Sequence, residues 1–130
     1  MTIAELASGS PGFEHIAVYA FREKGVLARV LLINSLPFFR KQADSVRPST
    51  HVDLQLIASS EGANSTFPIG MAIKRLTIGY ADDVAGLTWG GQTFETPDAR
   101  AGLQLVVPKV AVSEGVDIQA TEAVLLSFTY

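Results

Sequence analysis

The stretch EHIAVYAFREKGVLARVLLIN, residues 14–34, decides the fold class of this chain. Side chains alternate along 14–22 and again along 26–34, and this period of two is typical of β-strands. Residues 23–25, Glu-Lys-Gly, predict a short turn between them, because Gly25 adopts a positive φ without steric cost. The stretch therefore predicts an antiparallel β-hairpin.

Both faces of this hairpin are predicted to be apolar. If the turn has three residues, Arg22 pairs with Val26 and the side chains fall into two sets. The first set contains Ile16, Val18, Ala20, Ala28, Val30 and Leu32, and the second contains His15, Ala17, Tyr19, Phe21, Leu27, Arg29, Leu31 and Ile33. A sandwich buries one face of each sheet, so the second set is expected to meet a loop from 35–48, another domain or another copy of the chain.

A homodimer is the simplest of these covers, because one self-complementary patch is enough to form it. The residues expected to carry this self-association are Tyr19, Phe21, Leu27, Arg29 and Leu31.

Further short segments with strand character follow, separated by Gly, Pro, Ser and Asp. They are residues 49–57, 70–79, 103–108, 110–112, 116–120 and 122–130. A turn is predicted at 59–65, and short helical turns are predicted at 2–8 and 38–46. The chain of 130 residues is therefore expected to form one all-β domain, an antiparallel β-sandwich of seven to eight strands. Residues 1–12 are expected to be an N-terminal extension or an edge segment.

Charge and composition exclude several classes of protein. The net charge is −3, and residues 51–130 carry nine acidic side chains against four basic ones, so a nucleic-acid-binding module is not expected. No apolar run reaches the length of about 18 residues that a membrane span needs. Cysteine is absent and the first residues do not resemble a signal peptide, which fits a cytoplasmic location and leaves other locations open. A glycosylation sequon at 64–66 matters only on a secretory route.

The stretch GLTWGGQTFETPDARAG, residues 86–102, holds the candidate ligand-binding residues. Trp89 with Tyr80 and Phe94 predicts an aromatic platform for a sugar ring, and nearby polar side chains are able to bond its hydroxyl groups. The candidate binding residues are Trp89, Gln92, Tyr80, Glu95 and Asp98. The competing interpretation is that Trp89 plugs one end of the sandwich, and that the two glycines after it form a tight turn.

Catalysis and metal binding receive little support. A pair of carboxylates from Asp82, Asp83, Glu95 and Asp98 resembles the pairs that cleave glycosides, but all four lie in turn contexts and nothing in the sequence separates their pKa values. His51 and Asp53 lie two apart on a predicted strand, and no third ligand accompanies them. We therefore expect no catalytic residue, no metal and no cofactor.

Three segments together resemble a known family. They are HIAVYAF with GVLARVLLINSLPF, AIKRLTIGYADDVAGLTWGGQTFE, and GVDIQATEAVLLSF. They are similar, over about residues 13–129, to the C-terminal β-domain of glycoside hydrolase family 79, the β-glucuronidase and heparanase-like enzymes, and to its fungal members in particular. The most specific part is Tyr80-Ala81-Asp82-Asp83 followed by 87–92, Leu-Thr-Trp-Gly-Gly-Gln.

The resemblance implies a β-sandwich that packs beside a catalytic (β/α)₈ barrel, which covers part of the sandwich surface. The two catalytic glutamates of the family belong to that barrel, so none is carried over to this chain. The expected function is a non-catalytic accessory or interaction domain, and the alternative is a free-standing, lectin-like protein that binds a glycan. A secreted location is expected if the domain derives from a larger hydrolase.

Overall fold

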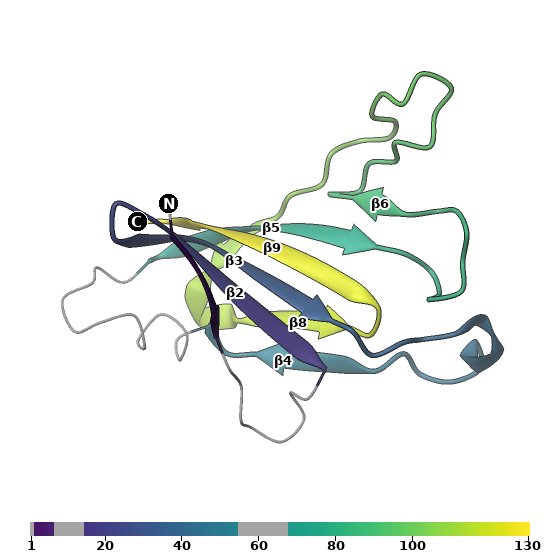
Figure 1. Ribbon diagram of the computed structural model, residues 1–130, viewed down its shortest axis with the longest axis horizontal. Coiled ribbons are helices and arrows are strands. Elements are labelled where there is room, and N and C mark those ends of the chain that lie inside the picture. The colour runs from purple at the N-terminus through teal and green to yellow at the C-terminus, as the bar shows by residue number, and fades with distance from the viewer. Residues whose placement is uncertain (1, 7–14, 55–67) are drawn as a thin grey trace.

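The computed structural model describes residues 2–6, 15–54 and 68–130 of the chain. Two antiparallel sheets make up the fold (Figure 1). The larger sheet has seven strands in the order β1-β2-β3-β9-β5-β6, with β7 also paired to β5, and the smaller sheet pairs β4 with β8. The strands are β1 Thr2–Leu6, β2 Ile16–Glu23, β3 Val26–Asn34, β4 Ser49–Val52, β5 Gly70–Thr77, β6 Thr88–Trp89, β7 Lys109–Ala111, β8 Val116–Gln119 and β9 Glu122–Thr129. The prediction of an all-β antiparallel fold is confirmed.

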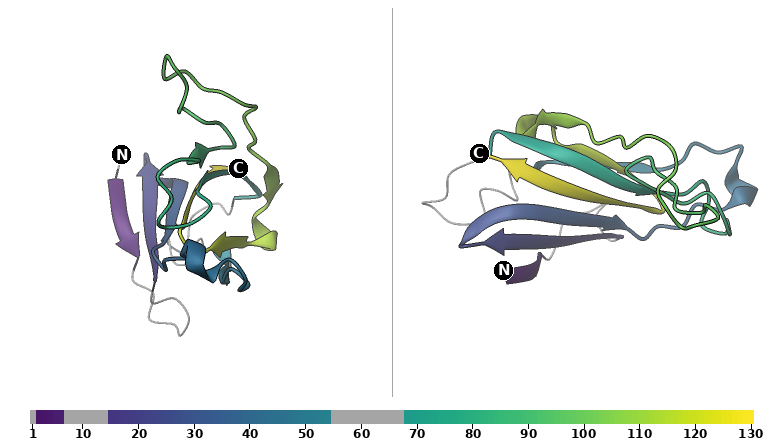
Figure 2. Two further views of the ribbon diagram at one scale, coloured as in Figure 1. Left: turned by 90° about the vertical axis from the view of Figure 1, so that its right-hand side faces the viewer. Right: turned by 90° about the horizontal axis from the view of Figure 1, so that it is seen from above.

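The core lies between the two sheets, because each strand of the hairpin turns alternate side chains toward the smaller sheet. Val30 and Leu32 of β3 are fully buried, as is Ile118 of β8, and all three belong to one apolar cluster. The smaller sheet lies on one side of the curved larger sheet (Figure 2). The other side of the larger sheet therefore receives no cover from β4 and β8.

The first hairpin closes with a turn that is one residue shorter than predicted. Lys24 and Gly25 both have positive φ, 53° and 77°, and Glu23 pairs with Val26. A bulge between Phe21 and Arg22 then shifts the register, after which the two strands pair regularly.

This turn corrects one predicted residue of the self-association patch. Arg22 pairs with Leu27, which places the Leu27 side chain in the core with 5% exposure instead of on the second face. Beyond the bulge, Tyr19 pairs with Leu31 and Phe21 pairs with Arg29, so the other four residues share one face as predicted.

Several further segments differ from the prediction or fall outside the description. Residues 2–6 form the edge strand β1 and not a helical turn. The segment 103–108 is not a strand, while β6 was not predicted. A 3₁₀ turn, η1 Arg40–Gln42, lies inside the predicted 38–46, and a second, η2 Val112–Glu114, precedes β8. The predicted turn at 59–65 and the sequon at 64–66 lie outside the described residues.

No helix in the described ranges is long and apolar enough to cross a membrane.

Candidate functional site

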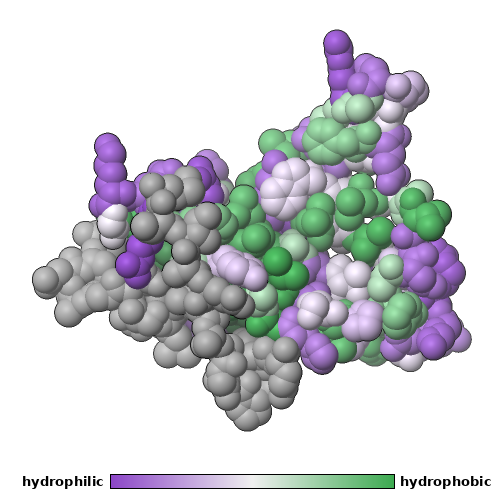
Figure 3. All heavy atoms as spheres, viewed as in Figure 1, coloured by the Kyte–Doolittle hydropathy of each residue, from purple (hydrophilic) through white to green (hydrophobic). Residues whose placement is uncertain are grey.

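The uncovered side of the larger sheet, here called the outer face, is the main candidate for a functional surface. It consists of the side chains that alternate with the core residues: Ala17, Tyr19 and Phe21 of β2, Arg29, Leu31 and Ile33 of β3, Ala72, Lys74 and Leu76 of β5, and Ala123, Leu125 and Ser127 of β9. The strand register aligns Tyr19, Leu31 and Leu125 in one row across three strands. Hydrophobic side chains gather over these central strands in Figure 3.

The loop at 35–48 does not cover the outer face, which removes one of the three expected covers. It is held at one end of the sandwich, where the Arg47 guanidinium donates to the carbonyl oxygens of Ala120 at 2.7 Å, Gly79 at 3.0 Å and Ile78 at 3.1 Å. The amide of Ala81 also donates to the carbonyl of Phe38 in this loop at 2.7 Å. Among the described residues, neither this loop nor the smaller sheet therefore covers the outer face, whose large apolar side chains are partly exposed.

Trp89 begins a tight turn at the edge of the larger sheet. Its amide donates to the carbonyl of Gln92 at 2.9 Å, and Gly90 and Gly91 between them have φ of 60° and 81°, as the sequence predicted for the glycine pair. The Trp89 ring is partly exposed and lies under the ammonium of Lys74, whose nitrogen is 4.7 Å from the ring centroid. Trp89 is thus only partly buried and lies outside the cluster of buried core residues.

Tyr80 belongs to a different cluster from Trp89. Its ring stacks on Phe38 with centroids 5.7 Å apart, and the Arg40 guanidinium lies 4.8 Å from the Tyr80 centroid. Arg40 also forms an ion pair with Asp83, which raises the pKa of the Arg40 guanidinium. In the part of the chain that the structure describes, Phe38–Tyr80 is the only ring–ring contact, so Trp89, Tyr80 and Phe94 do not stack into one platform.

The three polar candidates are used to fix the shape of the loop after β6. Both carboxylate oxygens of Glu95 accept from the amide of Gly86, at 3.0 and 3.2 Å. Asp98 accepts from the Thr96 hydroxyl at 3.3 Å and from the Arg100 amide at 3.2 Å. The Gln92 side-chain nitrogen is 3.5 Å from the carbonyl oxygen of Leu103, a marginal hydrogen bond. These groups support the local backbone, which is a structural role.

The histidine on β4 finds a cross-strand partner that the sequence analysis missed. His51 Nδ1 lies 2.7 Å from Asp117 Oδ1 on β8, directly opposite in the register, and both side chains are exposed. The missed signal is the pairing of β4 with β8, which sequence periodicity does not give. Within the described residues, no group of three or more His, Asp or Glu side chains is arranged to hold a metal ion.

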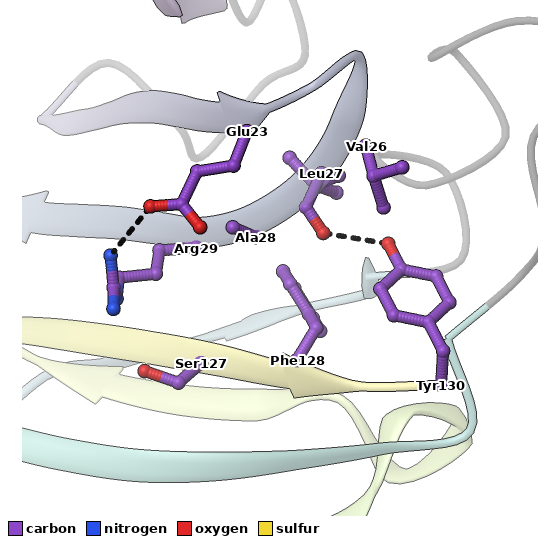
Figure 4. A pocket seen from close by; sticks show the side chains of 8 residues that line it. All are labelled: Glu23, Val26, Leu27, Ala28, Arg29, Ser127, Phe128 and Tyr130. Atoms are coloured by element: carbon purple, nitrogen blue, oxygen red, sulfur yellow. Dashed lines mark hydrogen bonds and ion pairs between the residues drawn. The ribbon is translucent and has the colours of Figure 1, made fainter. Parts of the chain in front are cut away.

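Two shallow hollows contain none of the candidate ligand-binding residues, although Leu27 and Arg29 of the predicted self-association patch line the first of them. The first, of about 310 Å³, lies at the end of the first hairpin (Figure 4), where Arg29 approaches Glu23 at 3.9 Å and the Tyr130 hydroxyl donates to the carbonyl of Leu27 at 2.6 Å. Partial burial raises the pKa of the Tyr130 phenol. The second, of about 410 Å³, lies beside β7 and is lined by Ile69, Gly70, Met71, Lys109, Val110, Ala111 and Thr129. Neither hollow presents a catalytic arrangement.

Comparison with known proteins identifies what the chain is similar to. A sequence model of the glycosyl hydrolase family 79 C-terminal beta domain matches residues 18–125. The crystal structure of a 4-O-α-L-rhamnosyl-β-D-glucuronidase from Fusarium oxysporum 12S, in complex with Rha-GlcA, is 28% identical with a TM-score of 0.70. The match covers 96% of this chain and 25% of that enzyme, so the chain spans about a quarter of its length. No curated protein matches the chain.

Proposed function

The chain belongs to the family of glycosyl hydrolase family 79 C-terminal beta domains, and we propose that it is a non-catalytic accessory domain that docks on a glycoside hydrolase catalytic domain. The outer face of the larger sheet is the docking surface. The similar Fusarium enzyme is a glucuronidase, so the proposed partner is a catalytic domain of that class. The observation that carries the proposal is an apolar row, Tyr19, Leu31 and Leu125, on the face that the smaller sheet leaves uncovered.

The composition of the outer face suits an interface. Its middle is formed by leucine, isoleucine, alanine and tyrosine, while the charged groups Arg29 and Lys74 are few and lie among them. Protein interfaces have this character, with aromatic residues and arginine enriched and most other charges moved to the rim. A large apolar patch left in water is uncommon on a protein that works alone.

The carboxylates of the chain support a non-catalytic role. A glycosidase needs two carboxyl groups facing one bond with different proton affinities. Glu95 and Asp98 instead accept hydrogen bonds from neighbouring backbone and hydroxyl groups, and Asp83 pairs with Arg40. We expect no hydrolysis of an aryl β-glucuronide by the purified chain, and steady hydrolysis that is lost in Glu95→Gln would contradict this part of the proposal.

Carbohydrate binding without a catalytic domain is the weaker candidate function. It requires an aromatic platform and polar groups that are free to bond sugar hydroxyls. Tyr80 stacks on Phe38 away from Trp89, and Glu95 is bonded to Gly86. A glycan array distinguishes the two functions, because a specific glycan signal that disappears in Trp89→Ala supports the lectin-like alternative.

The docking proposal is tested by binding in solution. The probe is the Fusarium glucuronidase produced without the quarter that matches this chain, titrated with the chain in a calorimeter. We expect binding that weakens at least about tenfold in Leu31→Asp, because a charge then enters the interface centre. The matched control is Val46→Asp, a change of the same kind at a side chain that is 92% exposed in the loop at 35–48. Equal affinity of both variants and the wild type would overturn the outer face as the docking surface.

A further inference from the structure

Exposed large hydrophobic side chains are concentrated in one part of the molecule. Of the ten that the described residues contain, six lie between residues 84 and 106: Val84, Leu87, Phe94, Leu103, Leu105 and Val106. The last four belong to residues 90–107, a segment that projects from the sheet after β6 and is here called the arm (Figure 1). Single exposed hydrophobic residues are normal on a protein surface, but such a concentration marks an interaction site.

The arm has a fixed structure at its base. The amide of Val106 donates to the carbonyl of Gly90 at 2.6 Å, and Thr93 and Gly102 exchange two backbone hydrogen bonds of 3.0 and 2.7 Å. A β-carbon added at Gly90 would lie 2.9 Å from a methyl group of Leu105, so the Leu105 side chain packs against Gly90 because Gly90 has no side chain. Leu105 is nevertheless 49% exposed and Val106 57% exposed. The side chains of Leu105 and Val106 are therefore exposed although hydrogen bonds fix the backbone that carries them.

The base of the arm lies beside the outer face. The same added β-carbon at Gly90 would lie 2.9 Å from the Lys74 side chain, which belongs to the outer face, and Lys74 also covers the Trp89 ring. The amide of Gly90 donates to the carbonyl of Arg75 at 2.8 Å, which fastens the base of the arm to β5. Leu105 is thus a neighbour of the proposed docking surface.

We infer that the arm is a second contact surface for the same catalytic domain, and that Leu105 and Val106 pack into an apolar hollow of that partner. The inference rests on the proposed function. The partner is chosen because a similar enzyme carries this fold as a quarter of its chain, so the fold is there joined covalently to the other three quarters. The sheet face and the projecting apolar arm contact the partner from two directions, because the segment that carries Leu105 and Val106 lies beyond the edge of the sheet (Figure 1).

The absence of cysteine from the chain allows each contact to be tested separately. Single-cysteine variants Leu105→Cys on the arm, Leu31→Cys on the outer face and Val46→Cys as a control are labelled with N-ethylmaleimide and followed by mass spectrometry. Labelling rates are compared with and without the Fusarium glucuronidase that lacks its matching quarter, after circular dichroism has shown that this shortened enzyme is folded. We expect the rates at positions 105 and 31 to fall about tenfold, because the centre of an interface excludes solvent, and the rate at 46 to stay unchanged.

The outcomes separate this inference from the proposed function. Protection at 31 with an unchanged rate at 105 overturns the arm contact and leaves docking by the outer face standing. Protection at 105 alone supports the arm and contradicts the outer face. Unchanged rates at both positions overturn both proposals, and a decrease at 46 as well shows nonspecific association, which also counts against both.

Discussion

The two faces of the larger sheet are built from the same strands and have different surroundings. On the inner face, Val30, Leu32, Val124 and Leu126 are completely buried against the smaller sheet. On the outer face, their sequence neighbours Leu31, Ala123 and Leu125 are partly exposed, and Arg29 is exposed. Similar hydrophobicity along the strands therefore supports two functions, a closed core on one side and, as we propose, an open docking surface on the other.

The difference between the two faces is tested most strongly at Leu31 and Leu32, two adjacent leucines whose side chains point to opposite faces. We expect Leu32→Ala to lower the free energy of unfolding by about 3 kcal/mol, because it leaves a cavity in a closed core. For Leu31→Ala we expect a loss of about 1 kcal/mol or less, since that side chain is already partly in water. Urea denaturation of the two variants gives both values. Equal losses would show that the outer face is as closed as the inner face and would remove the distinction.

The polar end of the inner face provides a second test. Arg75 donates to Glu122 at 2.7 Å, and the exposed fractions of the two side chains are 35% and 4%. Glu122 also accepts from the amide of Gln119 at 3.2 Å, in the turn that joins the two sheets. Removal of the cation leaves a buried carboxylate without its partner. We therefore expect Arg75→Met to lower the free energy of unfolding by about 3 kcal/mol.

Glu122→Gln is the matched variant for this pair. It keeps the side-chain shape and the hydrogen-bond acceptor and leaves behind a cation that is partly solvated, so we expect a smaller loss of about 1–2 kcal/mol. Denaturation curves at pH 7 rank the two variants. A larger loss of unfolding free energy for Glu122→Gln than for Arg75→Met would contradict the view that the buried carboxylate without a partner is what destabilises the domain.

Sequence periodicity predicted the central strands of the larger sheet and its apolar outer face, but not β1 or β6. The alternation in 14–34, 70–79 and 122–130 corresponds to β2, β3, β5 and β9. It failed for Leu27, because a bulge changes the facing of a side chain without any local signal in the sequence. Most of the outer-face residues remained correct because the shorter turn and the bulge together shift the pairing by two positions.

Two segments were misassigned because tertiary pairing overrides local preference. Residues 2–6 contain good helix formers, Ala4, Glu5 and Leu6, yet they pair with β2 at the edge of the sheet. The segment 103–108 has strand-like residues, but β6 and β7 already occupy the free edge of β5, so it forms one side of the arm. The candidate binding site was misjudged for the same reason, since sequence proximity placed Tyr80 beside Trp89, whereas the fold stacks Tyr80 on Phe38.

The smallest expected effect concerns association and not stability. Without a catalytic domain, we expect the outer faces of two copies of the chain to pair, since apolar area exposed to water is removed when they meet. Analytical ultracentrifugation at micromolar concentration measures this association. We expect Leu31→Asp to weaken it, because two-fold pairing places both substituted carboxylates in one interface.

Two controls make the result of that experiment decisive. Val46→Asp places the same charge at a side chain that is 92% exposed at the end of the sandwich, and we expect it to sediment like the wild type. Thermal melting of Leu31→Asp checks that the domain is still folded, and Leu125→Asp, in the same row of the outer face, replaces it if it is not. A wild-type chain that stays monomeric at the highest concentration contradicts self-association. Association that persists in both Leu31→Asp and Leu125→Asp would show that the two copies meet at another surface. The outer face would then be a partly apolar surface that stays exposed to solvent.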